Sequence, residues 1–175
     1  MQTTEPIWQC VWPSPLGEML LRCSAQGLRG VWFIGQRYFP ADANAFAATP
    51  GHALLRETQQ QLTAYFAGEL QQFMLPLDPV GTPFQHRVWQ GIARIPYGHT
   101  CSYGELAAAL GRPTAARALG HATGQNPLSL LIPCHRLLGK QGQLTGYAGG
   151  LPRKQALLQL EHTTLRTHHA TAQPD

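Results

Sequence analysis

The sequence predicts an α+β fold in two domains, because strand-like segments fill its first part and helix signals dominate the rest. Apolar residues make up 43% of the 175 residues and charged residues only 13%, which fits a folded globule and argues against wholesale disorder. Prolines and a glycine within residues 71–83 mark a connector. We therefore expect one domain over residues 1–78, a second over residues 79–164, and a frayed tail over residues 165–175.

Three short apolar runs near the start of the chain are typical of β-strands. Residues 7–12, 18–24 and 28–34 are rich in β-branched, aromatic and aliphatic side chains, and turn residues separate them. They predict a small antiparallel meander. After a loop, apolar side chains between residues 54 and 66 recur on one helical face, and Gly68 follows as a stop. This first part contains no visible catalytic set.

Two capping boxes mark helix starts in the second part. Thr82 and Gln85 form the first box, with Pro83 at the first helical position. Ser102 and Glu105 form the second. In each box two side chains satisfy backbone N–H groups that a helix start leaves free. We therefore expect one helix to begin at each box.

A third helix is predicted over residues 114–123, after a turn from Gly111 to Pro113. Two short helices joined in this way are typical of a helix-turn-helix. Apart from Arg117, the third helix offers mainly alanine and glycine, so its backbone can approach another surface closely. Close packing against another helix and docking on nucleic acid both explain this composition. In a basic domain we favour docking, mainly through phosphates, because few of these side chains can read base edges.

The charge is distributed unevenly along the chain. Residues 1–80 carry four basic and six acidic side chains, which gives −2, while residues 81–175 carry nine basic and three acidic ones, which gives +6. A basic half suggests a polyanionic partner. An ordinary solvated basic surface is the alternative.

The segment around Cys134 is the candidate reactive centre. A cysteine nucleophile reacts as the thiolate, which nearby imidazole or positive charge favours, and His135 and Arg136 follow directly. The alternative is a small buried apolar residue. Pro133 stiffens the backbone in front of the thiol. Because adjacent side chains on an extended segment point to opposite faces, we expect His135 to reach the thiol through a water or a bend.

Other segments flank this centre. Residues 128–132 predict a buried strand leading to the thiol, and glycines within residues 145–150 let a backbone approach a planar ligand. A last helix is expected from Pro152, with Glu161 near its end, where the helix dipole does not stabilise a carboxylate. We therefore expect His135 to be the partner of Glu161; a solvated surface glutamate is the alternative.

No metal or cofactor is expected from the residue pattern. The four cysteines are far apart and lack paired zinc spacing, so we expect free thiols. No apolar run is long enough to span a membrane, and no signal-like segment begins the chain. A cytoplasmic, nucleoid-associated protein is the expectation.

Several motifs resemble those of the O6-alkylguanine-DNA alkyltransferase family, in the same order and spacing. They lie at residues 14–17, 64–68, 102–107, 115–120, 124–127, 133–136 and 146–150. The resemblance covers about residues 7–162. It implies a ribonuclease H-like N-terminal α/β domain followed by a winged-helix-like C-terminal domain that carries the helix-turn-helix.

The resemblance also implies roles for single residues. Cys134 resembles the alkyl acceptor, and His135, acting through a water, resembles with Glu161 the relay that removes the thiol proton. Asn126 resembles the hinge residue that braces the helix-turn-helix against the active-site segment. Tyr103 resembles the phenol that meets the flipped guanine and its phosphate.

Two further sets of residues follow from the resemblance. Arg117 resembles the finger that fills the gap in the base stack, on a helix that enters the minor groove. The implied DNA contacts are Ser102, Tyr103, Ala115, Ala116, Arg117, Gly120 and Arg136. The implied substrate pocket is Ser129, Leu137, Tyr147 and Ala148.

The implied activity is DNA repair by a monomeric methylated-DNA–protein-cysteine methyltransferase. An alkyl group would move irreversibly from O6 of a flipped guanine in duplex DNA to Cys134, once per protein molecule. A lesion-binding protein without transfer, a transcriptional regulator and a cysteine hydrolase are the alternatives. Three positions depart from the family pattern. Ser129 stands where relatives can have proline, which bears on the size of the alkyl group that is accepted. Ala148 stands where some relatives have a hydroxyl residue, and Arg29, rather than a histidine, lies near Cys23, so no zinc is expected.

Overall fold

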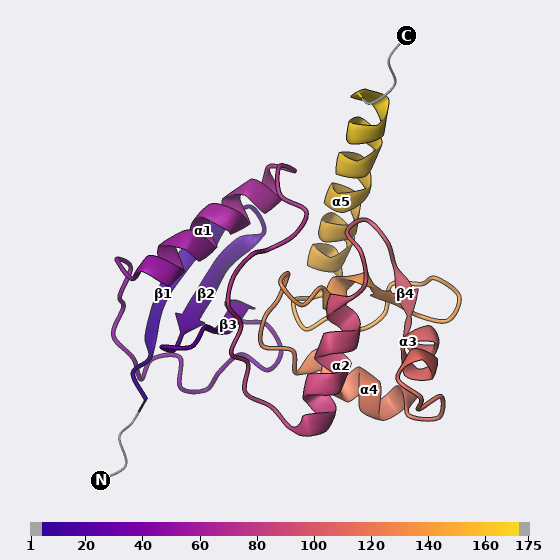
Figure 1. Cartoon of the computed structure of the whole chain (residues 1–175), viewed down its shortest axis with the longest axis horizontal. Coiled ribbons are helices and arrows are strands. Elements are labelled where there is room, and N and C mark those ends of the chain that lie inside the picture. Colours follow the sequence, from indigo (N-terminus) through magenta and orange to yellow (C-terminus); the bar gives the residue numbers. More distant parts are fainter. Residues whose placement is uncertain (1–4, 172–175) are drawn as a thin grey trace. The chain divides into compact units, whose positions relative to one another are not determined.

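The computed structural model describes residues 5–171, which form two compact units (Figure 1). The first unit runs to Gly81 and also contains Pro127–Leu131, and the second holds Thr82–Asn126 and the chain from Ile132 onward. A single boundary near residue 79 therefore does not describe the chain completely. The short segment Pro127–Leu131 belongs to the first unit although its neighbours on both sides belong to the second.

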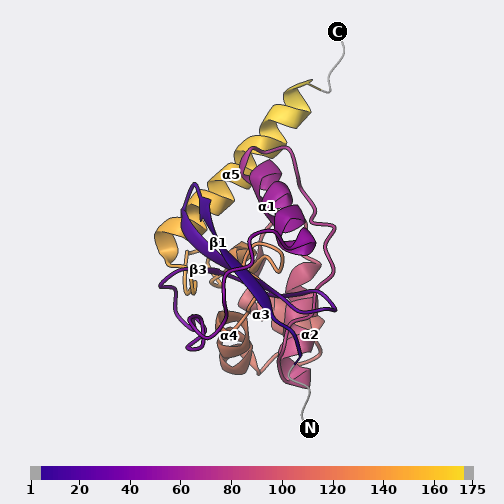
Figure 2. The same cartoon turned by 90° about the vertical axis from the view of Figure 1, so that its left-hand side faces the viewer.

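The first unit is an antiparallel sheet covered by one helix. Strands β1 (Trp8–Ser14), β2 (Gly17–Cys23) and β3 (Leu28–Phe33) pair in chain order, as the meander prediction requires. Helix α1 (Ala53–Phe66) lies along the sheet in both views (Figures 1 and 2). Alternate strand residues and one stripe of α1 form the core between them. Its most deeply buried side chains include Met19, Leu21, Phe33, Leu55, Leu62 and Tyr65.

The predicted strand at residues 128–132 is wrong. Leu128 makes one isolated bridge to Val31, supported by hydrogen bonds from Val31 N to Pro127 O (2.8 Å) and from Ser129 N to Val31 O (2.9 Å). Leu130 then turns to a φ of 74°, which ends any extended run. The segment is buried, as expected, but its backbone is irregular.

The second unit is mainly helical. It contains α2 (Pro83–Ala93), α3 (Tyr103–Ala109), α4 (Ala116–Gly124) and α5 (Leu151–Thr171), together with the 3₁₀ turn η1 (Cys134–Arg136). Two short strands, β4 (Cys101–Ser102) and β5 (Leu137–Leu138), pair in parallel.

Both predicted capping boxes are confirmed. The Thr82 hydroxyl accepts from Gln85 N at 3.2 Å and the Gln85 carboxamide accepts from Thr82 N at 2.8 Å. The Ser102 hydroxyl accepts from Glu105 N at 3.1 Å, and the Glu105 carboxylate accepts from Ser102 N at 2.7 Å. These local bonds fix the start of α2 and the start of α3.

Helices α3 and α4 form the expected helix-turn-helix, with α2 packed against both. Gly111, at a φ of 70°, turns the chain after α3. The Trp89 indole of α2 donates to Ala122 O of α4 at 2.9 Å. Leu119 and Ala122 are buried, whereas Ala116, Arg117 and Ala118 are exposed. The alanine side chains on the exposed side of α4 therefore do not pack against another helix of this unit.

Helix α5 is longer than predicted. Residues 165–171, expected to fray, are helical, and residues 172–175 lie outside the described residues. Thr164 is buried, and Leu165 packs over Gly98, so the helix has a reason to continue past Glu161. Glu161 consequently lies in the middle of α5, not near its end as predicted. Within residues 5–171, no helix combines the length and apolar character that crossing a membrane requires.

Candidate active site

Cys134 opens the η1 turn and is 5% exposed. Pro133, with φ −80° and ψ 63°, forms an inverse γ-turn in which Cys134 N donates to Ile132 O at 2.8 Å. The segment is thus bent rather than extended. This bend releases the thiol and the next side chain from the strict alternation of a strand.

Asn126 connects the end of α4 to the thiol. Its buried carboxamide nitrogen donates to Ile132 O at 2.8 Å and to Cys134 Sγ at 3.2 Å. A hydrogen bond to sulfur favours the ionised form. Asn126 therefore holds both the turn and the sulfur atom.

His135 forms a buried pair with Glu161. Its Nε2 lies 2.7 Å from Oε1 of Glu161, and both side chains are fully buried. Because the carboxylate accepts, Nε2 carries the proton and Nδ1 is left as an acceptor. Among the described groups, Nδ1 is buried and has no hydrogen-bond partner. Burial lowers the pKa of His135 more strongly than Glu161 raises it, so the imidazole is neutral.

The Glu161 carboxylate is held by four donors. Besides His135, it accepts from Arg136 Nε and Arg136 Nη2, each at 2.9 Å, and from Gly98 N at 3.0 Å. Burial raises the pKa of Glu161, but the hydrogen bonds from His135 and Arg136 outweigh it and lower the pKa to about 2. Glu161 therefore remains ionised when its neighbour takes up a proton.

Arg136 is part of this network, which corrects its prediction as a DNA contact. Its guanidinium is buried, donates twice to Glu161 and once to Ile95 O at 2.6 Å, and lies 5.6 Å from the Tyr97 ring centre. Three of its five N–H donors are thus used inside the unit, and two of them hold the Glu161 carboxylate.

The resting thiol is neutral. Burial raises the pKa of Cys134, and opposing it are the hydrogen bond from Asn126, the charge of Lys154 and the backbone amides of Cys134 and His135. The neighbours of the sulfur are thus polar and convergent, unlike those of a packed structural cysteine.

Three segments converge beside this centre. Strands β4 and β5 place Cys101 opposite Leu137, and Tyr103 begins α3 directly after β4. The Tyr103 hydroxyl donates to Gly146 O at 3.4 Å, which links it to the glycine-rich loop. In that loop the Tyr147 hydroxyl is buried and has no described partner, and Ala148 is half-buried. The predicted pocket residues Leu137, Tyr147 and Ala148 thus all belong to segments that meet around Tyr103.

The hydroxyls of two further predicted site residues have local hydrogen-bond partners. Ser129 is in the first unit, where its hydroxyl donates to Gln36 Oε1 at 3.5 Å. Ser102 uses its hydroxyl as the cap of α3. On α4, Ala116 and Arg117 are exposed, and Ala115 and Gly120 are half-buried.

Lys154 is a site residue that sequence reasoning missed. It lies in the first turn of α5, fully buried, and its ammonium donates to Leu137 O, to Thr145 O at 2.9 Å and to Gly146 O at 3.5 Å. A signal was present, because Lys154 shares a helical spacing of three and seven residues with buried Leu157 and Glu161.

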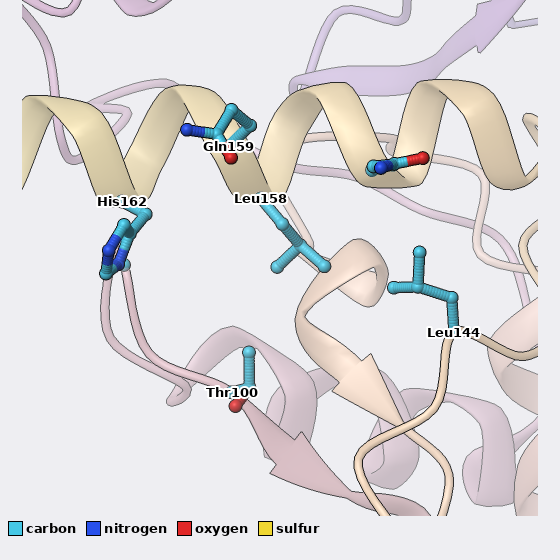
Figure 3. A pocket seen from close by; sticks show the side chains of 7 residues that line it. Thr100, Leu144, Leu158, Gln159 and His162 are labelled. Carbon is cyan, nitrogen blue, oxygen red and sulfur yellow. The ribbon is translucent and has the colours of Figure 1, made fainter.

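A separate pocket of about 290 Å³ lies against another face of α5 (Figure 3). Leu144 and Leu158 form its apolar side, and Thr100 and His162 lie at the other (Figure 3). Its complete lining is Gly98, Thr100, Leu144, Gln155, Leu158, Gln159 and His162. None of the candidate catalytic side chains lines it, so it is distinct from the thiol site.

The first unit contains a second thiol near an imidazole. Cys23 Sγ lies 3.5 Å from His52 Nδ1, and the His52 ring stacks on Trp8 with ring centres 4.5 Å apart. The tertiary structure thus brings a histidine to Cys23, which its sequence neighbours did not suggest. Within the described part of the chain, no three metal-ligating side chains cluster here or elsewhere.

A cysteine held beside a buried histidine–glutamate pair, in a domain with a helix-turn-helix, defines a DNA-binding protein with a cysteine nucleophile. Comparison with known families agrees. Residues 83–163 match the model of the 6-O-methylguanine DNA methyltransferase DNA-binding domain, and residues 9–79 match that of the ribonuclease-like domain of the same proteins. The chain belongs to the 6-O-methylguanine DNA methyltransferase family.

Individual relatives are similar over most of the chain. The methylated-DNA–protein-cysteine methyltransferase of Mycobacterium leprae is 47% identical over 148 residues, which cover 85% of this chain and 88% of the relative. The crystal structure of the Mycobacterium tuberculosis O6-methylguanine methyltransferase superposes with a TM-score of 0.83 at 43% identity, over 91% of this chain and 94% of that one. A second Mycobacterium tuberculosis structure, of OGT in complex with DNA, gives a TM-score of 0.85 at 44% identity, over 90% and 94% of the two chains.

Proposed function

We propose that this protein repairs DNA by moving an alkyl group from O6 of guanine in duplex DNA to Cys134 Sγ, once per molecule. Membership of the methyltransferase family supports the reaction type. The observation that carries the residue assignment is the thiol held by Asn126 beside the buried pair of His135 and Glu161. The second domain, residues 79–164, carries this chemistry.

The thiol first loses its proton. His135 presents Nδ1 as a free acceptor, and a water between Nδ1 and the sulfur completes the path from Cys134. The imidazolium that forms is paired with Glu161, which Arg136 and Gly98 keep ionised and fixed. Asn126 holds the thiolate in place.

The thiolate then attacks the alkyl carbon in line. The new S–C bond forms as the C–O6 bond breaks, and its electron pair leaves with guanine, which takes up one proton. The product is a thioether, and nothing in this reaction returns it to a thiol. The protein is therefore consumed stoichiometrically, which distinguishes it from a cysteine hydrolase.

The base must leave the helix to react. Cys134 is almost completely buried, so a guanine that is stacked inside a duplex cannot reach it. Flipping the base out of the duplex costs a few kcal/mol, on the order of the unstacking and unpairing energy in other base-flipping enzymes. We assign α4 to the minor groove, with exposed Arg117 filling the vacated place in the stack. Ala115, Ala116 and Gly120 permit a close approach, and Tyr103 meets the flipped nucleotide. The protein acts as a monomer at the nucleoid.

Single-turnover reaction with a duplex containing one O6-methylguanine tests the proposal. The peptide that contains Cys134 should gain one methyl group, with one equivalent transferred per protein. The Cys134→Ser variant should bind the duplex and transfer nothing. An unmodified Cys134 peptide at saturating substrate would instead support a lesion-binding protein without transfer.

A further inference from the structure

Helix α4 exposes one side, and the side chains along that side differ greatly in length. The residues that point into the unit are Leu119, Ala122 and Thr123. The exposed residues are Ala116, Arg117, Ala118 and His121. Along this helix, all of which the structure describes, Arg117 and His121 are thus the only exposed residues with a side chain longer than a methyl group. Arg117 already has a role in the proposed function, and His121 has none.

His121 lies one helical turn beyond Arg117. Side chains four residues apart on a helix are neighbours on one face and are separated by about 6 Å along the axis. Successive base pairs of a duplex are about 3.4 Å apart. If α4 lies along the minor groove, His121 therefore meets the groove one or two base pairs from the place that Arg117 fills.

Gly120, directly before His121, brings the helix backbone close to any surface that covers this side of α4. A β-carbon added at Gly120 would meet no atom within 4 Å, so packing inside the unit does not require a glycine here. A glycine within a helix costs about 0.5–1 kcal/mol relative to alanine. Because α4 belongs to the DNA-binding domain of this family, we take the covering surface to be DNA. A closer backbone lets the short His121 side chain reach the floor of a groove.

The His121 imidazole can donate a hydrogen bond to that floor, because it carries at least one N–H group in either protonation state. In the minor groove an A·T pair presents only acceptors, N3 of adenine and O2 of thymine, whereas a G·C pair adds the 2-amino donor of guanine. A donor on the protein therefore favours A·T pairs. A contact with a phosphate would not distinguish the two kinds of pair.

We propose, resting on the docking of α4 in the minor groove proposed above, that His121 is a second side chain of α4 that contacts DNA. It donates a hydrogen bond to N3 of an adenine one or two base pairs from the flipped guanine, and it favours A·T over G·C at that pair. His121 is exposed and Cys134 is buried, so His121 acts on the binding of the duplex and not on the transfer step.

Transfer from methylated duplex at limiting and at saturating DNA separates these two steps. His121→Ala should lower the second-order rate constant about fivefold, as expected for one hydrogen bond, and leave the rate at saturating DNA within about twofold of the wild type. His121→Gln keeps an N–H donor and should stay within about twofold in both measurements. His168→Ala removes an exposed imidazole from α5 and should do the same. An unchanged second-order constant for His121→Ala, or an equal loss at saturation, would overturn the proposal.

Removing single acceptor atoms from the DNA identifies the contact. The base 3-deazaadenine replaces N3 by a C–H group and keeps the base pair. It is placed in turn in either strand at the first and second pair on each side of the O6-methylguanine. At one position the wild type should lose about fivefold in the second-order constant and His121→Ala less than about twofold, so the two changes are not additive. Equal losses in both proteins at every position would place His121 on a phosphate or away from the DNA and contradict the inference.

The same duplexes distinguish this inference from the proposed function. At the pair identified by 3-deazaadenine, exchange of A·T for G·C should also slow the wild type about fivefold and His121→Ala less than about twofold. If the wild type transfers no methyl group to Cys134, the proposed function fails, and the His121 contact is tested by the same comparisons of duplex affinity in fluorescence anisotropy. If it transfers one methyl group per molecule and His121→Ala is equally fast on every duplex, only the role of His121 fails.

Discussion

Two buried arginines, one in each unit, are held by similar contacts and have different consequences. Arg22 in the first unit donates twice to Gln9 Oε1, at 3.1 and 2.9 Å, and once to Asp42 Oδ1 at 3.0 Å. Its guanidinium also lies over the rings of Trp32 and Phe46, at 5.5 and 4.7 Å from their centres. Arg136 in the second unit likewise donates to a carboxylate, that of Glu161, and to a carbonyl, Ile95 O, and its guanidinium lies over the Tyr97 ring.

The carboxylate partners make the difference. The Asp42 side chain is 55% exposed, whereas that of Glu161 is 0% exposed. Water therefore screens the Arg22 pair, and losing it leaves Asp42 solvated. Glu161 has no access to water and also holds His135, so Arg136 both compensates a buried charge and fixes the imidazole. The same side-chain type thus holds a loop in one unit and supports the proposed chemistry in the other.

Substituting each arginine should give the largest difference between the two units. Arg136→Met leaves a buried carboxylate without its main partner and should lower the free energy of unfolding by about 3–5 kcal/mol. Arg22→Met leaves Gln9 unsatisfied but Asp42 exposed, and should cost about 1–3 kcal/mol. Urea unfolding at pH 7 measures both. Equal losses would mean that the exposure of the carboxylate does not decide the cost.

Acidification should weaken the second unit through Glu161. The folded-state pKa of Glu161 is lowered from 4.5 to about 2, so its stabilisation is complete above pH 4.5 and is lost as pH falls toward 2. The loss should amount to about 3 kcal/mol. The lowered pKa of His135 acts in the same direction, since the unfolded chain takes up that proton below about pH 6.5 while the folded protein does not.

Unfolding of the wild type and of Glu161→Gln, followed by urea at several pH values, measures this difference. The variant should be less stable at pH 7, and the gap to the wild type should narrow as pH falls below 4.5. A constant gap down to pH 2.5 would show that Glu161 is not the group responsible.

Substituting the two carboxylates should change the rate of alkyl transfer to different extents. Glu161→Gln should slow transfer from methylated duplex by about 100-fold, because the imidazolium loses its paired charge. Asp42→Asn should stay within about twofold of the wild type, since it changes a half-exposed pair in the other unit. Single-turnover rates at pH 7.5 with equal active-thiol concentrations provide the measurement. A slow Asp42→Asn protein would connect the first unit to the chemistry and remove the contrast.

Substitution of a third arginine, the exposed Arg117 on α4, should have the smallest effect on transfer, and only with duplex DNA as the substrate. Arg117→Ala should slow transfer from duplex about tenfold, because nothing then fills the gap in the base stack. Reaction with free O6-benzylguanine should be unchanged, since no stack is involved. Parallel single-turnover assays on the two substrates give the ratio, and equal slowing would argue against stack filling.

Much of the fold followed from short-range patterns in the sequence. The capping boxes at Thr82 and Ser102 predicted two helix starts, and the apolar runs predicted the three-stranded meander. The hydrogen bond between His135 and Glu161 was also expected, but on the premise that Glu161 lies near the end of a helix, whereas it lies in the middle of α5. The pairing depends instead on the burial of the Glu161 carboxylate, which accepts four hydrogen bonds.

The starts of α2 and α3 follow from local sequence alone, because a capping box closes its hydrogen bonds within three residues. The sequence also determined which thiol stands next to an imidazole in the chain. Only the tertiary structure decided that Arg136 is enclosed, since its partners lie 25 and 41 residues away. The burial of Lys154 is likewise decided by the tertiary structure. Its three acceptors are backbone carbonyls, and every residue type carries one, so the sequence does not identify them. Burial and long-range hydrogen bonds depend on how elements pack, and that packing is not encoded in any local pattern.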